Sequence, residues 1–93
     1  MKAIWNDEII AKSNETIVVE DNHYFPADSV KKDFLEPSDT RSCCCWKGEA
    51  SYCTIKIGDE LNKDAAWFYP DPKEKALNIK NYIAFWKGVE IIE

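Results

Sequence analysis

Chemically reactive side chains are densest between Ser42 and Tyr52, where the chain reads Ser-Cys-Cys-Cys-Trp-Lys-Gly-Glu-Ala-Ser-Tyr. A thiolate is the reactive form of cysteine, and a nearby ammonium group favours it. Lys47 could therefore activate Cys44, provided that a turn brings them together, because in an extended chain they point to opposite faces. We identify Cys44 as the candidate catalytic thiol. A structural cysteine beside a solvated lysine is the favoured interpretation.

The same cysteines also raise the question of a metal site. Zinc takes four nitrogen or sulfur ligands, and two of them commonly come from a Cys-x-x-Cys motif, which is absent here. In an extended chain Cys43 and Cys45 share one face while Cys44 points away, so the candidate ligands are Cys43, Cys45, Cys53 and His23. Free cysteines also serve as small buried or half-buried hydrophobic residues. That role is favoured, and we expect no metal and no other cofactor.

Aromatic residues are the second set of side chains that could form a site. The chain has four Trp, four Tyr and four Phe, and Trp and Tyr carry polar groups that let a ring line a wet cleft. If Ala65–Tyr69 is a strand, Trp67 and Tyr69 share a face and Phe68 lies on the other. We expect a ligand-binding cleft in which a lysine offers charge to an anionic or carbonyl group. Its candidate residues are Lys47, Tyr52, Trp67, Tyr69, Tyr24 and Trp46.

One alternative to this cleft is that the rings all belong to the core, since a small domain needs large side chains to bury enough apolar area.

Two further residues bear on a site. Gly48 lacks a side chain and would let a ligand approach the backbone closely. Asp71, held between two prolines, could act as an acid or base, but capping the helix that follows is the favoured role.

Composition limits the classes of function. The chain has 93 residues, 45% hydrophobic and 31% charged, which predicts one soluble globular domain spanning residues 1–93. A net charge of −5 argues against nucleic acid or an anionic membrane surface as the partner. No apolar run is long enough to cross a membrane. We expect a cytoplasmic protein with reduced thiols, present as a monomer or homodimer.

The N-terminal third reads as short strands separated by turns. Lys2–Trp5 and Glu8–Lys12 are expected to form a hairpin, because Asn6-Asp7 tolerates the positive φ of a two-residue turn. The β-branched run within Thr16–Glu20 predicts a strand that is buried on both faces or lies at a sheet junction. His23–Phe25 continues as a strand.

The middle of the chain contains the most regular strand pattern. We expect a short helix in Ala27–Leu35 and a loop at Glu36–Asp39, where proline, serine and aspartate favour turns. In Glu49–Ile57, strict alternation places Ile55 on the core face and Tyr52 on the opposite face. Gly58–Asp64 is expected to be a polar connection.

The last third adds strands and one helical segment. After the strand Ala65–Tyr69, we expect a short helix in Lys73–Asn81 and a strand at Tyr82–Trp86, with Val89–Ile92 pairing back on it as a hairpin. Seven or eight short strands with frequent turns favour a sandwich or small barrel. The fold class is therefore mostly β: a small antiparallel two-sheet domain or a partly open barrel, with one or two short helices in connections.

Four blocks of sequence resemble one family. They are Tyr24-Phe25-Pro26, Cys44-Cys45-Trp46-Lys47-Gly48 with the following Ala50-Ser51-Tyr52, Ala66–Pro72, and Tyr82–Phe85. In this order they resemble the domain-of-unknown-function family numbered four-two-seven (DUF427) over nearly the whole chain. The resemblance implies a β-tent-like fold, similar to that of methionine-R-sulfoxide reductases and Yippee-like proteins, in which two antiparallel sheets meet at an angle.

The resemblance carries limited information about activity. Where the family usually has Cys-Pro, this chain has Cys44-Cys45, so the family's thiol corresponds to Cys44. The family carries an automatic nucleotidyltransferase label. That reaction needs paired carboxylates on a metal and a phosphate-binding loop, and the sequence shows neither.

Taken together, these observations predict a small protein that binds a small molecule or a peptide side chain in an aromatic-lined cleft. The alternatives are a thiol-dependent enzyme acting through Cys44, a nucleotidyltransferase by family label only, and a protein-interaction module. Whether the protein has any catalytic activity is left open.

Overall fold

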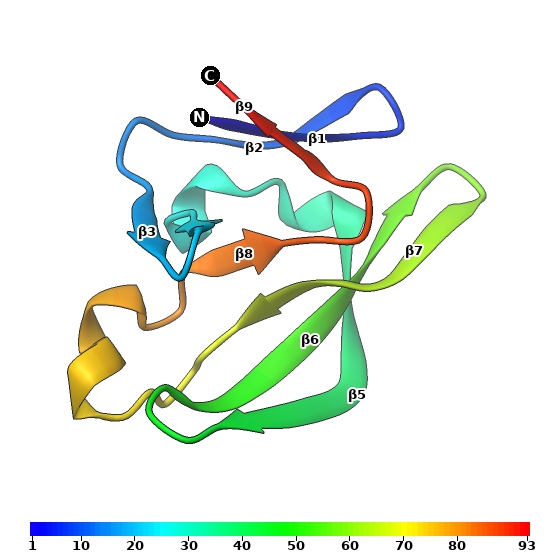
Figure 1. Cartoon of the computed structure of the whole chain (residues 1–93). Coiled ribbons are helices and arrows are strands. Elements are labelled where there is room, and N and C mark those ends of the chain that lie inside the picture. Colours follow the sequence, from blue (N-terminus) through cyan, green and yellow to red (C-terminus); the bar gives the residue numbers. More distant parts are fainter.

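The computed structural model describes residues 1–93, and almost all of its regular structure is β. The strands divide into three small antiparallel sheets, ordered β2-β1-β9, β3-β4 and β5-β6-β7-β8, and they do not close into a barrel (Figure 1). The helical segments are three short 3-10 turns in the connections: η1 (Ala27–Ser29), η2 (Lys32–Phe34) and η3 (Glu74–Ile79). The predicted mostly β, antiparallel fold class is confirmed. None of these helical segments could span a bilayer.

The first sheet is built around the N-terminal hairpin. Strands β1 (Lys2–Trp5) and β2 (Glu8–Lys12) pair as predicted, and Asn6 and Asp7 both have the positive φ that their turn requires. The prediction for β9 (Glu90–Ile92) was wrong. It pairs with β1 rather than with the preceding strand, so both ends of the chain lie in this sheet (Figure 1). The local turn residues Lys87-Gly88 gave no indication of this long-range pairing.

The second sheet is the β3–β4 hairpin. Strands β3 (Ile17–Val19) and β4 (Asn22–Tyr24) are joined by a turn in which Glu20 and Asp21 have φ values of 52° and 67°. Of the two alternatives predicted for β3, burial on both faces was wrong, since Val18 is 55% exposed. The predicted helix in 27–35 is also corrected. The chain makes the two turns η1 and η2 there instead, separated by two extended residues, Val30 and Lys31.

The third sheet corrects a predicted loop. Strand β5 (Leu35–Cys44) runs through 36–39, and a shift of register between Pro37 and Arg41 absorbs the turn-forming residues as an irregularity within the strand. In this segment the Thr40 hydroxyl donates a 2.7 Å hydrogen bond to Asp64. Hydrogen bonds from Ser38 and Thr40 lower the pKa of that carboxyl group.

The other long strands of this sheet are β6 (Gly48–Ile57) and β7 (Glu60–Phe68), with the short β8 (Ile83–Phe85) at the edge. The expected polar connection at 58–64 is wrong. Only Gly58 and Asp59 lie between β6 and β7, and pairing starts at Ile57 and Glu60. Gly58, with φ of 59°, permits this tight hairpin, so charged residues expected in a loop lie in the strand.

Two groups of buried side chains lie on opposite faces of the third sheet. Ile55 and Phe68 belong to the first group, which the β1–β2–β9 sheet covers, and Tyr52 and Trp67 pack on the second. The alternation predicted for β6 and β7 therefore holds at these positions. The fully or nearly buried members of the second group are Tyr24, Ala50, Tyr69, Ala76, Ile79 and Ala84.

Candidate functional site

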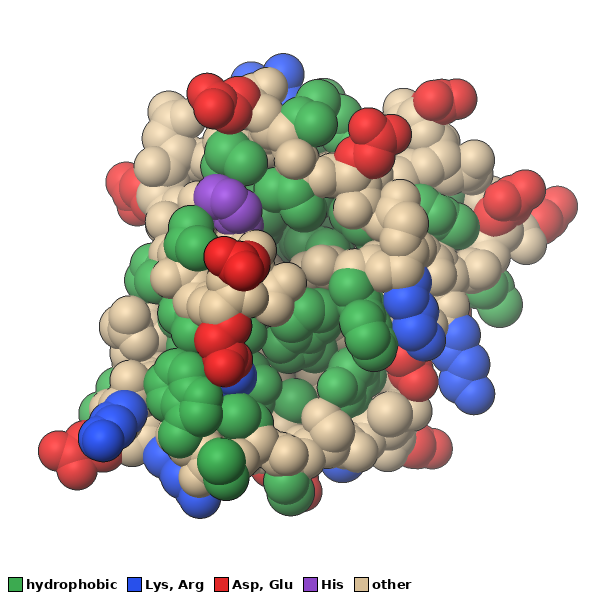
Figure 2. Space-filling model, in the orientation of Figure 1, with side chains coloured by type: hydrophobic (Ala, Val, Ile, Leu, Met, Phe, Trp, Pro, Cys, Tyr) green, Lys and Arg blue, Asp and Glu red, His purple; other side chains and the backbone are tan.

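A cleft of about 270 Å³ opens on the face of the third sheet that carries the second group. Strands β6 and β7 contribute one side of it, and the β3–β4 hairpin contributes the other. Figure 2 shows a recess with hydrophobic side chains at its floor on this side of the molecule, and acidic side chains nearby. Its lining residues are Asn22, Tyr24, Lys47, Tyr52, Trp67, Tyr69 and Trp86.

The pairing of β6 with β7 sets the positions of the sheet-borne rings. Tyr52 and Trp67 are directly opposite each other across the two strands, so their side chains point to the same face. Tyr69 follows two residues after Trp67 and remains on that face. Phe68, between them in the sequence, points to the opposite face and packs on the first group of buried side chains. The sheet thus presents three neighbouring rings to the cleft.

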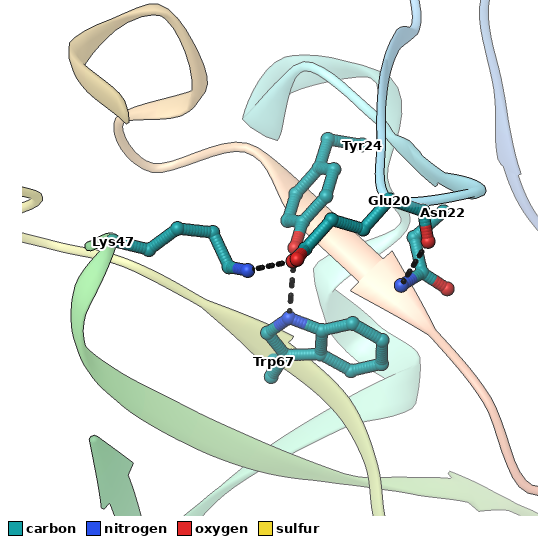
Figure 3. Close-up of polar contacts among 5 residues, drawn as sticks. All are labelled: Glu20, Asn22, Tyr24, Lys47 and Trp67. Atoms are coloured by element: carbon teal, nitrogen blue, oxygen red, sulfur yellow. Dashed lines mark hydrogen bonds and ion pairs between the residues drawn. The ribbon is translucent and has the colours of Figure 1, made fainter. Parts of the chain in front are cut away.

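Tyr24 projects from β4 to meet these rings. Its ring stands edge-on to Trp67, with centroids 6.1 Å apart and planes at 89°, and it lies 6.5 Å from the ring of Tyr69. The Trp67 indole N–H donates to the Tyr24 hydroxyl at 3.3 Å (Figure 3). Burial raises the pKa of Tyr24, and it raises that of Tyr69 to about 12. Both phenols are therefore protonated near neutral pH and can act as hydrogen-bond donors.

Lys47 supplies the one cation in the cleft. It lies in the turn between β5 and β6, and its side chain is only 7% exposed. Its ammonium group forms an ion pair with Glu20 (Figure 3) and lies 4.6 Å from the centroid of the Trp46 ring. Burial acts to lower the pKa of Lys47, but hydrogen bonds to Glu20 and Cys44 outweigh burial, so the pKa is raised. Lys47 is therefore a fully charged, desolvated ammonium.

The turn that holds Lys47 also brings Cys44 to it, as the thiol hypothesis requires. Cys44 is the last residue of β5 and is half-buried. Burial acts to raise the pKa of its thiol. Hydrogen bonds from the backbone of Trp46 and Lys47, together with the Lys47 side chain, more than offset this and lower the pKa. These donors favour the thiolate form of Cys44.

Two expectations about this turn are corrected. A side chain at Gly48 would meet the chain's own backbone, with the Asp71 carbonyl oxygen 3.4 Å away, so the missing side chain admits residues 71–73 rather than a ligand. Asp71 does not cap η3, whose N-cap is Lys73 and has no side-chain hydrogen bond. Lys73 instead fastens the turn, because its backbone N–H donates to the Lys47 carbonyl at 2.9 Å and its ammonium to the Cys45 carbonyl at 2.8 Å.

The candidate metal ligands are not brought together. Cys43 and Cys45 are exposed in and after β5, while Cys53 packs on the first core. His23 lies on β4, with its Nδ1 3.1 Å from the Thr16 hydroxyl. The structure contains no group of three or more His, Cys, Asp or Glu side chains arranged to hold a metal.

Of the six candidate ligand-binding residues, five line the cleft, and Trp46 lies beside it against Lys47. Sequence reasoning missed Asn22, Trp86 and Glu20. Trp86 lies edge-on to Trp67 with centroids 5.7 Å apart, and its indole N–H donates to the Asp64 carbonyl at 2.6 Å. Its position one residue after β8 was visible as an aromatic residue at the end of a predicted strand. Nothing in the sequence linked Glu20 to Lys47.

The chain was also compared with known proteins. The family profile described as Domain of unknown function (DUF427), designated NTP_transf_9, matches residues 1–93. A search of curated proteins gave no match.

Proposed function

Since the chain belongs to the DUF427 family, whose description assigns no function, we propose its function from the cleft: it binds a small molecule or a peptide side chain there. The observation that carries the proposal is that five rings line one open cleft: Tyr52, Trp67 and Trp86 are partly exposed there, and Tyr24 and Tyr69 are buried beneath them. Rings that served only the core would close on one another. Apolar walls with a few placed polar groups are typical of ligand sites.

The cleft supplies two kinds of interaction for such a ligand. The faces and edges of Trp67 and its neighbours offer contact area for a flat or aliphatic group, with little side-chain entropy to lose because the rings already pack against each other. Lys47 and Tyr24 both line the cleft, and their polar groups offer hydrogen bonds to an oxygen atom (Figure 3). A volume of about 270 Å³ suits a ligand the size of one amino-acid side chain or a single-ring compound better than a nucleotide.

The test is a fragment screen by NMR, with the four tryptophan indole N–H signals as reporters. Binding in the cleft is expected to shift the signals of Trp67 and Trp86 and to leave that of Trp5, which packs on the first core, unchanged. Trp67→Ala should abolish these shifts. A screen in which single-ring compounds move none of the indole signals, or move Trp5 as much as Trp67, contradicts the proposal.

A thiol-dependent reaction at Cys44 is the second candidate, because the turn donors and Lys47 stabilise its thiolate next to the cleft. Reaction requires access to a sulfur that is half-buried. Its test is the rate of alkylation at neutral pH, described in the Discussion. The geometry offers nucleotidyl transfer no cluster of carboxylates, and we do not propose it.

A further inference from the structure

We propose that the ligand of the cleft carries a carboxylate group, and that Glu20 occupies the position of that carboxylate while the cleft is empty. The inference rests on the proposed function, because it names the ligand class for the same cleft. It also assigns Glu20 a role as an internal competitor, which the ligand must displace from Lys47.

The two partners of the ion pair differ in burial. The side chain of Lys47 is 7% exposed and that of Glu20 is 57% exposed. A buried ammonium requires a hydrogen-bonded counter-charge, whereas an exposed carboxylate is well solvated without one. Lys47 therefore depends on an anion in this position more than Glu20 depends on Lys47. An incoming carboxylate would satisfy Lys47 equally well and would release Glu20 to water.

The two partners also differ in how firmly the backbone holds them. Lys47 lies in a turn that is fastened through both the backbone and the ammonium group of Lys73. Glu20 lies in the two-residue turn between β3 and β4, and its carboxylate interacts with Lys47 and Trp46. Glu20 can therefore leave by rotation of its own side chain, while the lysine stays in place.

The surroundings of the Glu20 carboxylate resemble a binding site for a carboxylate with an apolar body. Figure 3 shows this group reaching across from the hairpin to the Lys47 ammonium. The charges of both Lys47 and Glu20 act on the pKa of Tyr24, whose hydroxyl accepts the Trp67 indole N–H. A ligand oxygen bound at the same place would lay the rest of the molecule in the cleft against the partly exposed Trp67 ring. Ring faces also attract cations, but here Lys47 would repel a ligand cation unless Glu20 stayed in position.

The experiment compares three ligands with similar rings and different charges: phenylacetate, phenylacetamide and phenethylamine. Each is titrated by NMR into the wild type, Glu20→Ala and Glu20→Gln, after thermal unfolding has shown which variants are folded. Removing the Glu20 carboxylate raises the fraction of molecules in which Lys47 is free to bind a ligand. Phenylacetate should therefore bind Glu20→Ala or Glu20→Gln on the order of tenfold more tightly than the wild type, and phenylacetamide should change less than about twofold.

A second readout follows Glu20 itself. When phenylacetate binds the wild type, the ¹³C signal of the Glu20 carboxylate should move to the position of a free, solvated glutamate, and phenylacetamide should not cause this shift. Adding Lys47→Gln to Glu20→Gln removes the charge that selects the acid, so acid and amide should then bind with equal affinity.

The outcomes separate the two proposals. If phenylacetamide binds but phenylacetate gains nothing from loss of Glu20, or if phenethylamine binds most tightly, the role assigned to Glu20 is wrong while the cleft remains a binding site. If none of the three compounds binds any folded variant, both proposals are overturned.

Discussion

Trp67 is the residue on which the proposed cleft depends most, and its replacement gives a quantitative test. The ring makes edge-on contacts with Tyr24 and Trp86 and donates a long hydrogen bond of 3.3 Å to the Tyr24 hydroxyl. Trp67→Phe keeps an aromatic ring and loses the donor. Trp67→Ala loses the donor and both ring contacts.

The magnitudes follow from these contacts. A hydrogen bond between neutral groups contributes about 1 kcal/mol, so Trp67→Phe should lower the melting temperature by about 4–8 °C for a chain of this size. A fully buried Trp→Ala change costs about 3–5 kcal/mol. Because Trp67 is only half-buried, we expect about 2–3 kcal/mol for Trp67→Ala. Phenylacetamide binding should weaken about fivefold in the first variant and more than about twentyfold in the second.

The assay is thermal unfolding followed by NMR titration with phenylacetamide. Trp5→Phe is the matched control, since it makes the same chemical change on β1, where the ring packs on the first core away from the cleft. It should leave the affinity unchanged. Wild-type affinity in Trp67→Ala, or an equal loss of affinity in Trp5→Phe, would refute the assignment of Trp67 to the binding surface.

Three further predictions follow from groups described above. Cys44 should be alkylated by iodoacetamide near pH 7 faster than the other three cysteines, because hydrogen bonds lower its pKa, and Lys47→Met should slow it; equal rates by tandem mass spectrometry would exclude the thiol candidate. The pKa of Asp64 is lowered in the folded protein, so its ionised carboxylate stabilises the fold at pH values above the pKa of an unfolded aspartate. This stability is lost as the pH falls below about 4, so in urea unfolding from pH 2 to 6 the free energy of unfolding of Asp64→Asn should depend less on pH than that of the wild type. Gly48 has a φ of 113° and its added Cβ would meet the backbone of residues 71–73, so Gly48→Ala should lower the free energy of unfolding by about 1–3 kcal/mol. Gly58→Ala should cost less, because Gly58 has a φ of 59° and an added Cβ there meets no other atoms. Equal losses of free energy in urea unfolding would contradict this reasoning.

Local patterns in the sequence predicted those features that depend on neighbours in the chain. The Asn6-Asp7 turn, the alternation along β6 and the common face of Trp67 and Tyr69 are each set within a few residues. This is why five candidate residues could be placed near one another before the structure was known. Such alternation says which face a ring lies on. It does not say whether the opposing surface closes over it.

The errors lie where distant segments decide the outcome. Pro37 and its neighbours read as a loop, but pairing with β6 holds them in a strand with an irregular register. The charged residues of 58–64 suggested a long connection, but β6 and β7 are joined by the two residues Gly58 and Asp59 alone. The ion pair between Glu20 and Lys47 joins residues 27 positions apart, and no local pattern predicts such a partner.

The partnership of β1 with β9 has a consequence for how the protein acquires its structure. The middle strand of the first sheet, β1, is synthesised well before one of its two neighbours, which is made of residues 90–92. Until those residues are synthesised, β1 has a free edge able to pair with another chain. We therefore expect refolding to be limited by this long loop closure.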